Sequence, residues 1–174
     1  MKRNFKPFFL TALIILLDQV TKALVVKHIP VNTVYGSYFS DFLRIVHVRN
    51  NAVAFSIGSG LPYVLKVVLF ILIPLLVLFF LAVYMVKADK KELSTFERYL
   101  IAAIIGGGCG NIIDRIFRSM SVVDFISTNN YGLFGMDRFP TYNIADASVV
   151  VAVVLFLILL LFGRKVEKSE QEET

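Results

Sequence analysis

The chain has 174 residues, of which 57% are hydrophobic and 18% are charged, and its mean hydropathy is +0.73. This composition is too apolar for a soluble domain of this size and is typical of an integral membrane protein. The net charge of +5 is not gathered into a basic block interleaved with aromatic residues, so we expect no nucleic acid as a partner. The single cysteine, Cys109, excludes a disulfide within the chain.

Four apolar segments predict membrane-spanning helices, at residues 8–26, 63–86, 99–116 and 144–162. A cleaved signal peptide is the alternative for the first segment, but polar residues interrupt it and no small-x-small cleavage site follows. Pro74 is expected to kink the second segment. In the third, Gly106 and Gly110 form a small-xxx-small pattern, which lets a neighbouring helix approach closely.

The connections between the spans complete the predicted organisation. Residues 27–62 are expected to form an outer loop with short β-strands at 35–39 and 42–48, where β-branched and aromatic residues gather. Residues 118–142 are expected to form an outer gating loop, or lid, and the charged tail at 164–174 is expected to be disordered. We therefore predict one membrane-embedded domain over residues 1–174, all-α in its membrane part with a small β part.

Lysine and arginine side chains predict the orientation of the chain in the membrane. Ten of them lie before the first span, between the second and third spans, or in the tail, and five lie in the other two loops. Because the cytoplasmic side carries the excess of positive residues, both termini are expected to be cytoplasmic and the strand-bearing loop to face outside.

Polar residues enter three of the spans in pairs that each share a helix face: Asp18 with Lys22, Asn111 with Asp114, and Asn143 with Asp146. A helix rises about 1.5 Å per residue, so Asp114 lies roughly 24 Å and Asp146 roughly 27 Å from the cytoplasmic edge of a core about 30 Å thick. Asp124 lies in the following loop and can fold back to the same depth. The sequence therefore predicts one polar site in the outer half of the membrane.

Placing several carboxylates at the edge of a bilayer costs free energy, so a group of them indicates a functional site. Two that approach closely can share one proton, so that one activates water while the other polarises a carbonyl group, as in aspartic proteases. The same acids are also suited to a proton relay in a carrier, or to a network that only holds helices together. The residues by themselves do not distinguish between a protease, a proton relay and a structural network. The two histidines show no metal-binding spacing, so we expect no metal and no cofactor.

Five sequence blocks, in order along the chain, resemble the lipoprotein signal peptidases of bacteria, also called signal peptidase II. The blocks are DQVTK (Asp18–Lys22), RN through AF (Arg49–Phe55), GG with GNIIDR (Gly106–Arg115), VVDFI (Val122–Ile126) and FP with NIAD (Phe139–Asp146). The resemblance covers almost the whole chain. Each block alone is a weak signal, whereas five in order in a four-span chain of this length are highly specific.

The resemblance implies an aspartic endopeptidase of the bacterial cytoplasmic (inner) membrane, with its active site on the extracytoplasmic side. Such enzymes remove the signal peptide of prolipoproteins on the amino side of a cysteine that carries a diacylglyceryl group. The implied partners are diacylglyceryl-modified prolipoproteins, membrane lipid and the cyclic peptide inhibitor globomycin, and we expect a monomer.

The family's catalytic pair corresponds to Asp124 and Asp146 of this chain. Spacing alone does not choose this pair, because Asp114 with Asp146 fits as well. The other residues that the resemblance places in supporting or substrate-binding roles are Asp18, Lys22, Asn50, Asn111, Asp114, Arg115, Asn143 and Ala145.

Two departures from the family pattern stand out. Ala52 occupies a position where many members have glycine, and residues 129–136 lengthen the loop between Asp124 and Asp146. The alternative function is a small proton-coupled carrier that uses the same acids as a relay. A carrier gains little from a long outer loop with strands, whereas a protease needs such a surface to bind a peptide.

Overall fold

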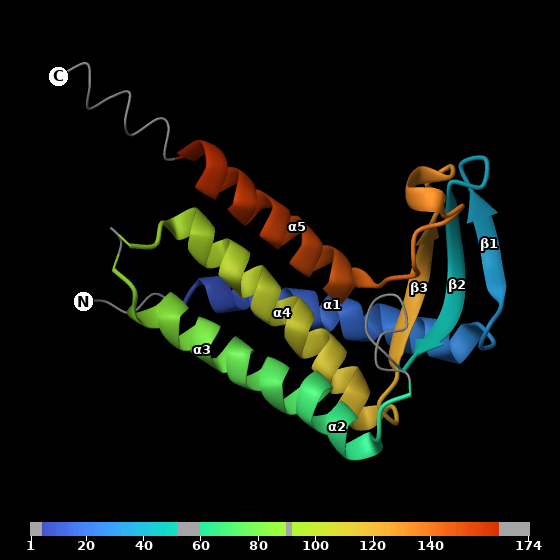
Figure 1. Ribbon diagram of the computed structural model, residues 1–174, viewed down its shortest axis with the longest axis horizontal. Coiled ribbons are helices and arrows are strands. Elements are labelled where there is room, and N and C mark those ends of the chain that lie inside the picture. The colour runs from blue at the N-terminus through green and yellow to red at the C-terminus, as the bar shows by residue number, and fades with distance from the viewer. Residues whose placement is uncertain (1–4, 52–59, 90–91, 164–174) are drawn as a thin grey trace.

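The computed structural model describes residues 5–51, 60–89 and 92–163 and contains four long apolar helices and a small sheet (Figure 1). The helical spans are α1 (Pro7–His28), the continuous segment Tyr63–Lys87, α4 (Thr95–Phe117) and Ile144–Phe162, which begins with α5 (Ile144–Ile158) and runs into the π-helical turn η4 (Leu159–Gly163). All four are long and apolar enough to cross a membrane, so the prediction of four spans is confirmed.

The second span is not one regular helix. It consists of α2 (Tyr63–Val67), the π-helical turn η2 (Val68–Leu72) and α3 (Ile73–Lys87). The wide turn ends where the Ile73 N–H donates to the Val68 carbonyl, one residue before Pro74. Proline has no N–H to donate to the preceding turn, and the irregularity lies in that turn, close to where the sequence predicted a kink.

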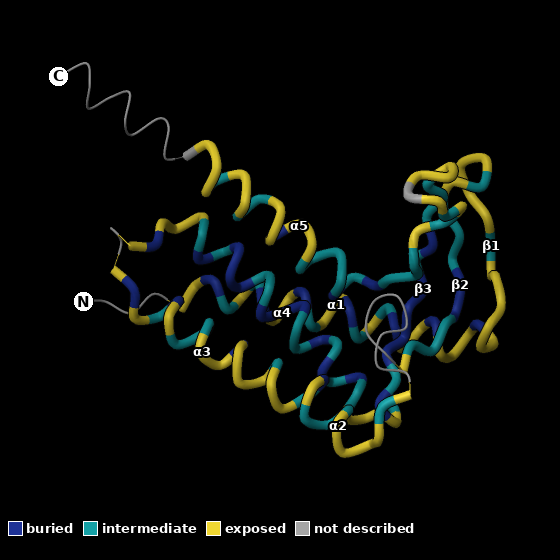
Figure 2. The backbone as a smooth tube through the Cα atoms, viewed as in Figure 1, coloured by how far each residue is buried: buried dark blue, intermediate teal, exposed yellow. Residues whose placement is uncertain are grey.

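Helix α4 lies at the centre of the bundle, in contact with α1, α3 and α5. Half of its membrane segment (50%) is buried inside the protein, against 11% of the second span and of the span that starts with α5. The large apolar side chains of α3 and α5 are mostly exposed, as in Figure 2, because their partner is lipid. Because other helices surround α4, polar side chains on it can lie inside the protein and not in lipid.

Close packing around α4 depends on its glycines. A Cβ on Gly107 would lie 2.4 Å from the Ala145 carbonyl oxygen, and one on Gly110 would lie 2.7 Å from Asp18 Oδ2. The α4 backbone therefore touches both α1 and α5. The contact with α1 lies at Gly110 of the predicted small-xxx-small pattern, whereas Gly107, which contacts α5, lies outside that pattern.

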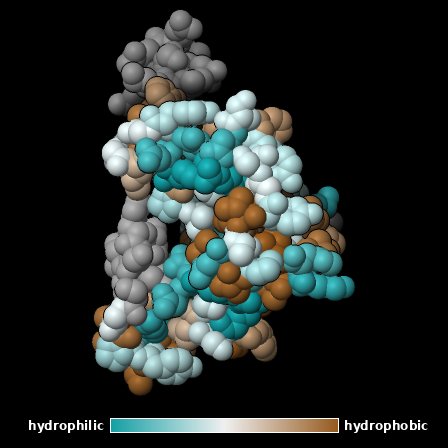
Figure 3. Space-filling model, turned by 90° about the vertical axis from the view of Figure 1, so that its right-hand side faces the viewer, coloured by the Kyte–Doolittle hydropathy of each residue, from teal (hydrophilic) through white to brown (hydrophobic). Residues whose placement is uncertain are grey.

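The sheet has the order β1-β2-β3, with antiparallel neighbours, and lies at one end of the bundle (Figure 1). Its strands are β1 (Val34–Tyr38), β2 (Leu43–Asn50) and β3 (Val122–Thr128). The first two match the predicted strands closely. Figure 3, which looks onto this end of the molecule, shows hydrophilic and hydrophobic surface side by side.

Strand β3 lies where the sequence analysis expected a loop, so that part of the prediction is wrong. The segment is short and almost wholly buried, without the alternation of buried and exposed residues that marks a surface strand. It forms because it pairs with β2, from Leu43 with Thr128 to Asn50 with Val122. The paired residues are far apart in the chain, so no local sequence pattern predicts that they pair.

The rest of the predicted gating loop is attached to the sheet. Tyr142 pairs with Ile126, and the 3-10 turn η3 (Leu133–Gly135) lies in the excursion between them. The Arg138 guanidinium donates to the Ser127 hydroxyl at 2.9 Å and to the Asp41 carbonyl at 2.9 Å. Asp41 also accepts from Arg44 and Ser37, and these bonds lower the pKa of its carboxyl to about 2. The role of this loop as a lid stays a prediction.

Candidate active site

Asp146 lies in the first turn of α5, where Asn143 caps the helix. The Asn143 side-chain oxygen accepts from the Asp146 N–H at 2.9 Å, and the Asn143 N–H donates to Asp146 Oδ2 at 3.1 Å. This capping box satisfies two backbone N–H groups that the helix itself leaves unpaired. It also holds a carboxylate at the positive end of the helix dipole.

Asp124 lies in the middle of β3, with 2% of its surface exposed. Two side-chain amides donate to its carboxylate: Asn50 Nδ2 to Oδ2 at 3.0 Å and Asn143 Nδ2 to Oδ1 at 2.8 Å. Asn50 reaches it from β2, the strand paired with β3. The amide of Asn143 therefore joins the environment of Asp124 to that of Asp146.

Asn111 brings α4 into the same group. Its Nδ2 donates to Asp146 Oδ1 at 2.7 Å, and its Oδ1 accepts from Asn143 Nδ2 at 3.2 Å. Five residues that the sequence analysis named thus meet in one network from four elements: Asn50, Asn111, Asp124, Asn143 and Asp146.

A second group of named residues forms a buried ion cluster beside the first. The Lys22 ammonium lies 2.8 Å from Asp18 and 3.2 Å from Asp114, and all three side chains are fully buried. Asp18 accepts from the Ala145 N–H at 3.0 Å, so the cluster also holds the first turn of α5. Asp114 accepts from the Val123 N–H at 2.9 Å, which fixes the backbone just before Asp124.

Arg115 lies between the acids and the second span. Its Nη1 donates to the Asn111 carbonyl at 3.3 Å, and its guanidinium carbon lies 5.6 Å from the centre of the Phe70 ring. Its guanidinium lies close enough to Asp146, Asp124 and Asp114 to interact electrostatically with all three. Arg115 thus contributes positive charge next to a group of carboxylates in a low-dielectric region.

Two residues of this region were not among the predicted site residues. Gln19 donates to Asp114 Oδ1 at 3.0 Å and to the Gly110 carbonyl at 3.0 Å, and Arg118 forms an ion pair with Asp114 and donates to Gln19 at 3.2 Å. The i,i+4 spacing of Asp114 and Arg118 was a signal that could have found the second of them. These contacts, together with Lys22 and the Val123 N–H, engage both carboxylate oxygens of Asp114 within the ion cluster.

Burial, followed by the negative charge of Asp146, raises the pKa of Asp124 from 3.8 to about 7. The amides of Asn50 and Asn143 and the charge of Lys22 act in the opposite direction without cancelling this rise. A carboxyl group that keeps a proton near neutral pH, next to a second carboxylate, has the properties of an acid–base pair.

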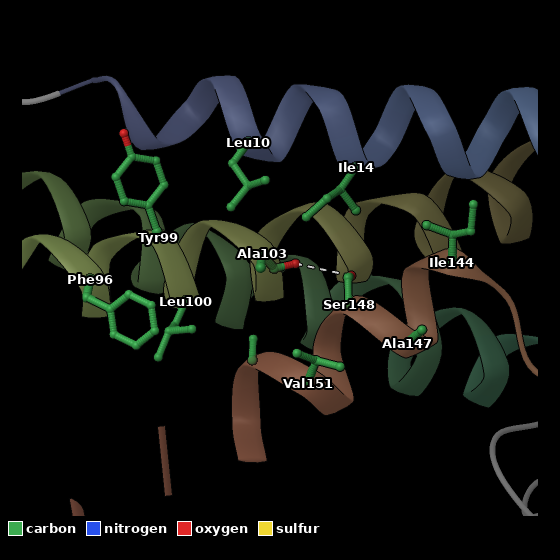
Figure 4. A pocket seen from close by; sticks show the side chains of 11 residues that line it. Leu10, Ile14, Phe96, Tyr99, Leu100, Ala103, Ile144, Ala147, Ser148 and Val151 are labelled. Atoms are coloured by element: carbon green, nitrogen blue, oxygen red, sulfur yellow. Dashed lines mark hydrogen bonds between the residues drawn. The ribbon is translucent and has the colours of Figure 1, made fainter. Parts of the chain in front are cut away.

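An apolar groove of about 460 Å³ lies apart from these acids, between α1, α4 and α5 (Figure 4). On α5 it is lined by Ile144, Ala147, Ser148 and Val151, which share one helix face. Asp146 is roughly 200° around the helix from Ile144 and bonds to α4 on another face. The groove is therefore separate from the carboxylate site.

The match to known proteins decides the family. A family model described as signal peptidase (SPase) II matches residues 10–162 of the chain. The chain belongs to the signal peptidase II family. Relatives named lipoprotein signal peptidase include one from Borreliella afzelii (strain PKo), 42% identical over 164 residues and 94% of each chain, and one from Borrelia turicatae (strain 91E135), 43% identical over 162 residues and 93% of each chain.

Two solved structures share the fold of the chain. One, described as a bacterial membrane enzyme at 2.3 Å resolution, has a TM-score of 0.77 and 33% identity and covers 92% of this chain and 91% of its own. A second, at 1.9 Å, has a TM-score of 0.75 and 30% identity and covers 92% and 97%. The chain is therefore a multi-pass membrane peptidase with the fold of these enzymes, and family membership favours the peptidase over the carrier.

Proposed function

We propose that the chain is an aspartic endopeptidase that removes the signal peptide of prolipoproteins, on the amino side of a cysteine carrying a diacylglyceryl group. Asp124 and Asp146 are the catalytic pair. The observation that carries this proposal is the Asn143 side chain, which donates to Asp124 while it caps the helix turn that holds Asp146. Asp114 lacks this connection, because Lys22, Gln19, Arg118 and the Val123 N–H occupy its oxygens.

In the proposed reaction the ionised member of the pair takes a proton from a water molecule, and the water oxygen bonds to the scissile carbonyl carbon. The protonated member donates a hydrogen bond to the carbonyl oxygen. In the breakdown of the tetrahedral intermediate, the C–N bond breaks and the amine nitrogen receives a proton from the pair.

Three asparagines support this pair by donating hydrogen bonds to it. Asn50 and Asn143 donate to Asp124, and Asn111 donates to Asp146. Such donors stabilise the charged form of a carboxylate and fix its direction. Arg115, Asp18, Lys22 and Ala145 support the pair from outside these contacts.

The setting of the proposed reaction is the extracytoplasmic side of the bacterial inner membrane. There the acyl chains of the substrate can stay in lipid while its scissile bond reaches the acids. We also propose, on the family resemblance, that globomycin blocks this site and that the enzyme works as a monomer.

The test is a gel-shift cleavage assay with purified protein in detergent and a diacylglyceryl-modified prolipoprotein. Asp124→Asn and Asp146→Asn are each expected to lower the rate by at least about 100-fold, because each removes an acid or a base from the reaction. Asp89→Asn, which changes an exposed acid of the α3–α4 connection, is the matched control and is expected to cleave normally.

The Asp114→Asn variant separates the two possible pairings. We expect it to fold poorly or to keep part of its activity, because Asp114 holds structure and not substrate. A well-folded, inactive Asp114→Asn beside an active Asp124→Asn would contradict the pairing but not the peptidase. Absence of cleavage by the wild type, under conditions where a known signal peptidase II cleaves, would contradict the proposed function itself.

A further inference from the structure

Lys22 contacts more than its two carboxylate partners. Its ammonium donates to Asp18 Oδ2 at 2.8 Å and lies 3.2 Å from Asp114 Oδ2. The third contact is to Asn111 Oδ1 at 2.9 Å. An ammonium group has three N–H donors and no acceptor, so these three oxygens use all of them. One donor of a fully buried cation is thus directed to a neutral amide.

This contact decides which way the Asn111 amide points. The ammonium can face only the oxygen of the amide, since it has nothing to accept a proton from the nitrogen. The Asn111 Nδ2 is then left on the other side, where it donates to Asp146 Oδ1 at 2.7 Å. A reversed amide would bring two oxygens together at Asp146 and two N–H donors together at Lys22.

The second amide of the network is fixed from a different source. The Asn143 oxygen accepts from the Asp146 N–H at 2.9 Å, so its Nδ2 is free to donate to Asp124 at 2.8 Å. The same Nδ2 reaches Asn111 Oδ1 at 3.2 Å, longer than the Lys22 bond to that oxygen. Lys22 is therefore the stronger of the two constraints on Asn111.

From these contacts we propose that Lys22 is a positioning residue for the peptidase reaction. It acts through Asn111: the buried ammonium orients the amide that donates to Asp146. This inference rests on the proposed function for its catalytic consequence. The orientation of Asn111 and its effect on the titration of the acids do not depend on the substrate.

A test of Lys22 must hold the local charge constant. The charged groups around it are Asp18, Asp114, Arg115, Arg118, Asp124 and Asp146. In the double variant Lys22→Met/Asp18→Asn one positive and one negative charge disappear together, while the new asparagine can still accept from the Ala145 N–H. This variant removes the Lys22–Asn111 bond without changing the net charge of the cluster. Asp18→Asn alone keeps that bond.

Two measurements apply to each variant. The first is the kcat and KM of prolipoprotein cleavage. The second is the titration of the catalytic carboxyls, followed by NMR of ¹³C-labelled aspartate in detergent micelles, which needs no substrate. For the double variant we expect kcat to fall at least about tenfold with little change in KM, and the apparent pKa of the pair to rise. Asp18→Asn alone should keep more of its kcat than the double variant.

The control is Thr11→Val, which also removes a buried α1–α4 hydrogen bond, from the Thr11 hydroxyl to the Ala102 carbonyl at 2.8 Å, about two helical turns before Asp18. It is expected to leave kcat and the titration unchanged.

A folded double variant with wild-type kcat and titration overturns the proposal. If the double variant does not fold, the Asn111→Leu variant takes its place, because it removes the amide through which Lys22 acts. A wild-type titration of the acids in Asn111→Leu then overturns the proposal. An inactive wild type with a shifted titration in the double variant contradicts the proposed function alone.

Discussion

At the scale of single residues, Asn143 shows how one side chain serves both structure and chemistry. Its oxygen caps α5 and its nitrogen donates to Asp124. It is fully buried, so every polar atom it carries needs a partner inside the protein. These two tasks can be separated by substitution.

Asn143→Ser should keep the cap, because serine caps helices about as well as asparagine, but it loses the amide donor to Asp124. Asn143→Ala loses both and should be destabilised by about 1 kcal/mol more than the serine variant. We expect both variants to lose most of their cleavage activity and only the alanine variant to show the extra stability loss. Thermal unfolding in detergent measures the difference in stability, and the cleavage assay measures the activity. If the alanine variant is as stable as the serine variant, the Asn143 side chain does not stabilise α5 as a cap.

The raised pKa of Asp124 predicts a pH dependence of catalysis. Burial, then the charge of Asp146, raises it from 3.8 to about 7. If the reaction needs the proton on this pair, the rate should fall as the pH rises through about 7. A pH profile of kcat/KM measures this, and a rate that keeps rising through pH 8 would contradict it.

The same shift has a consequence for stability. Between pH 3.8 and about 7 the folded protein holds a proton on Asp124 that the unfolded chain has released, so this contribution to stability is present below pH 3.8 and is lost as the pH rises through about 7. The Asp124→Asn variant cannot titrate there. Its stability should therefore depend less on pH in this window than that of the wild type.

At the scale of elements, α4 and its glycines determine whether the site can form. Asn111 and Asp146 lie on different helices, and their 2.7 Å bond needs the two backbones close together. Gly107 makes this possible, since it lies against the first two turns of α5 at Ala145, Ser148 and Val149.

Gly107→Ala should therefore push α4 away from α5. We expect a stability loss of about 1–3 kcal/mol, the usual cost of overpacking, and a lower cleavage rate because Asn111 moves away from Asp146. Gly60→Ala is the matched control, since its new Cβ would meet nothing within 4 Å and should change neither quantity. Equal behaviour of the two variants would contradict this account of α4.

At the scale of the whole molecule, the sheet and the α3–α4 connection lie at opposite ends of the helix bundle (Figure 1). The four spans separate these ends by the thickness of a membrane. The excess of lysine and arginine predicts that the end with the α3–α4 connection is cytoplasmic and that the sheet is outside.

Cysteine labelling tests this orientation. In a Cys109→Ala background, an impermeant maleimide should label Tyr35→Cys, on the exposed part of β1, in intact spheroplasts. Glu92→Cys, in the α3–α4 connection, should be labelled only after lysis. The reverse pattern would contradict the predicted orientation and the outer location of the acids.

The four spans could be predicted from the sequence, because segments of this length and mean hydropathy have few stable alternatives to a membrane helix. The sequence determined β1 and β2, whose residues favour strands locally. It also brought together the polar residues of α1, α4 and α5, since helix rise fixes the depth of each one. Strand β3 could not be predicted in this way, because so short and buried a strand forms only when it pairs with β2.

The differences between the three acids Asp114, Asp124 and Asp146 depend on the tertiary fold. By spacing, Asp114 and Asp124 were equal candidates to pair with Asp146. Pairing of β3 with β2 brings Asp124 beside Asn50 and Asn143, while the fold surrounds Asp114 with Lys22, Gln19 and Arg118. The environment of a carboxyl group depends on atoms from distant parts of the chain, so only the folded arrangement distinguishes an acid held in an ion cluster from one whose proton is available near neutral pH.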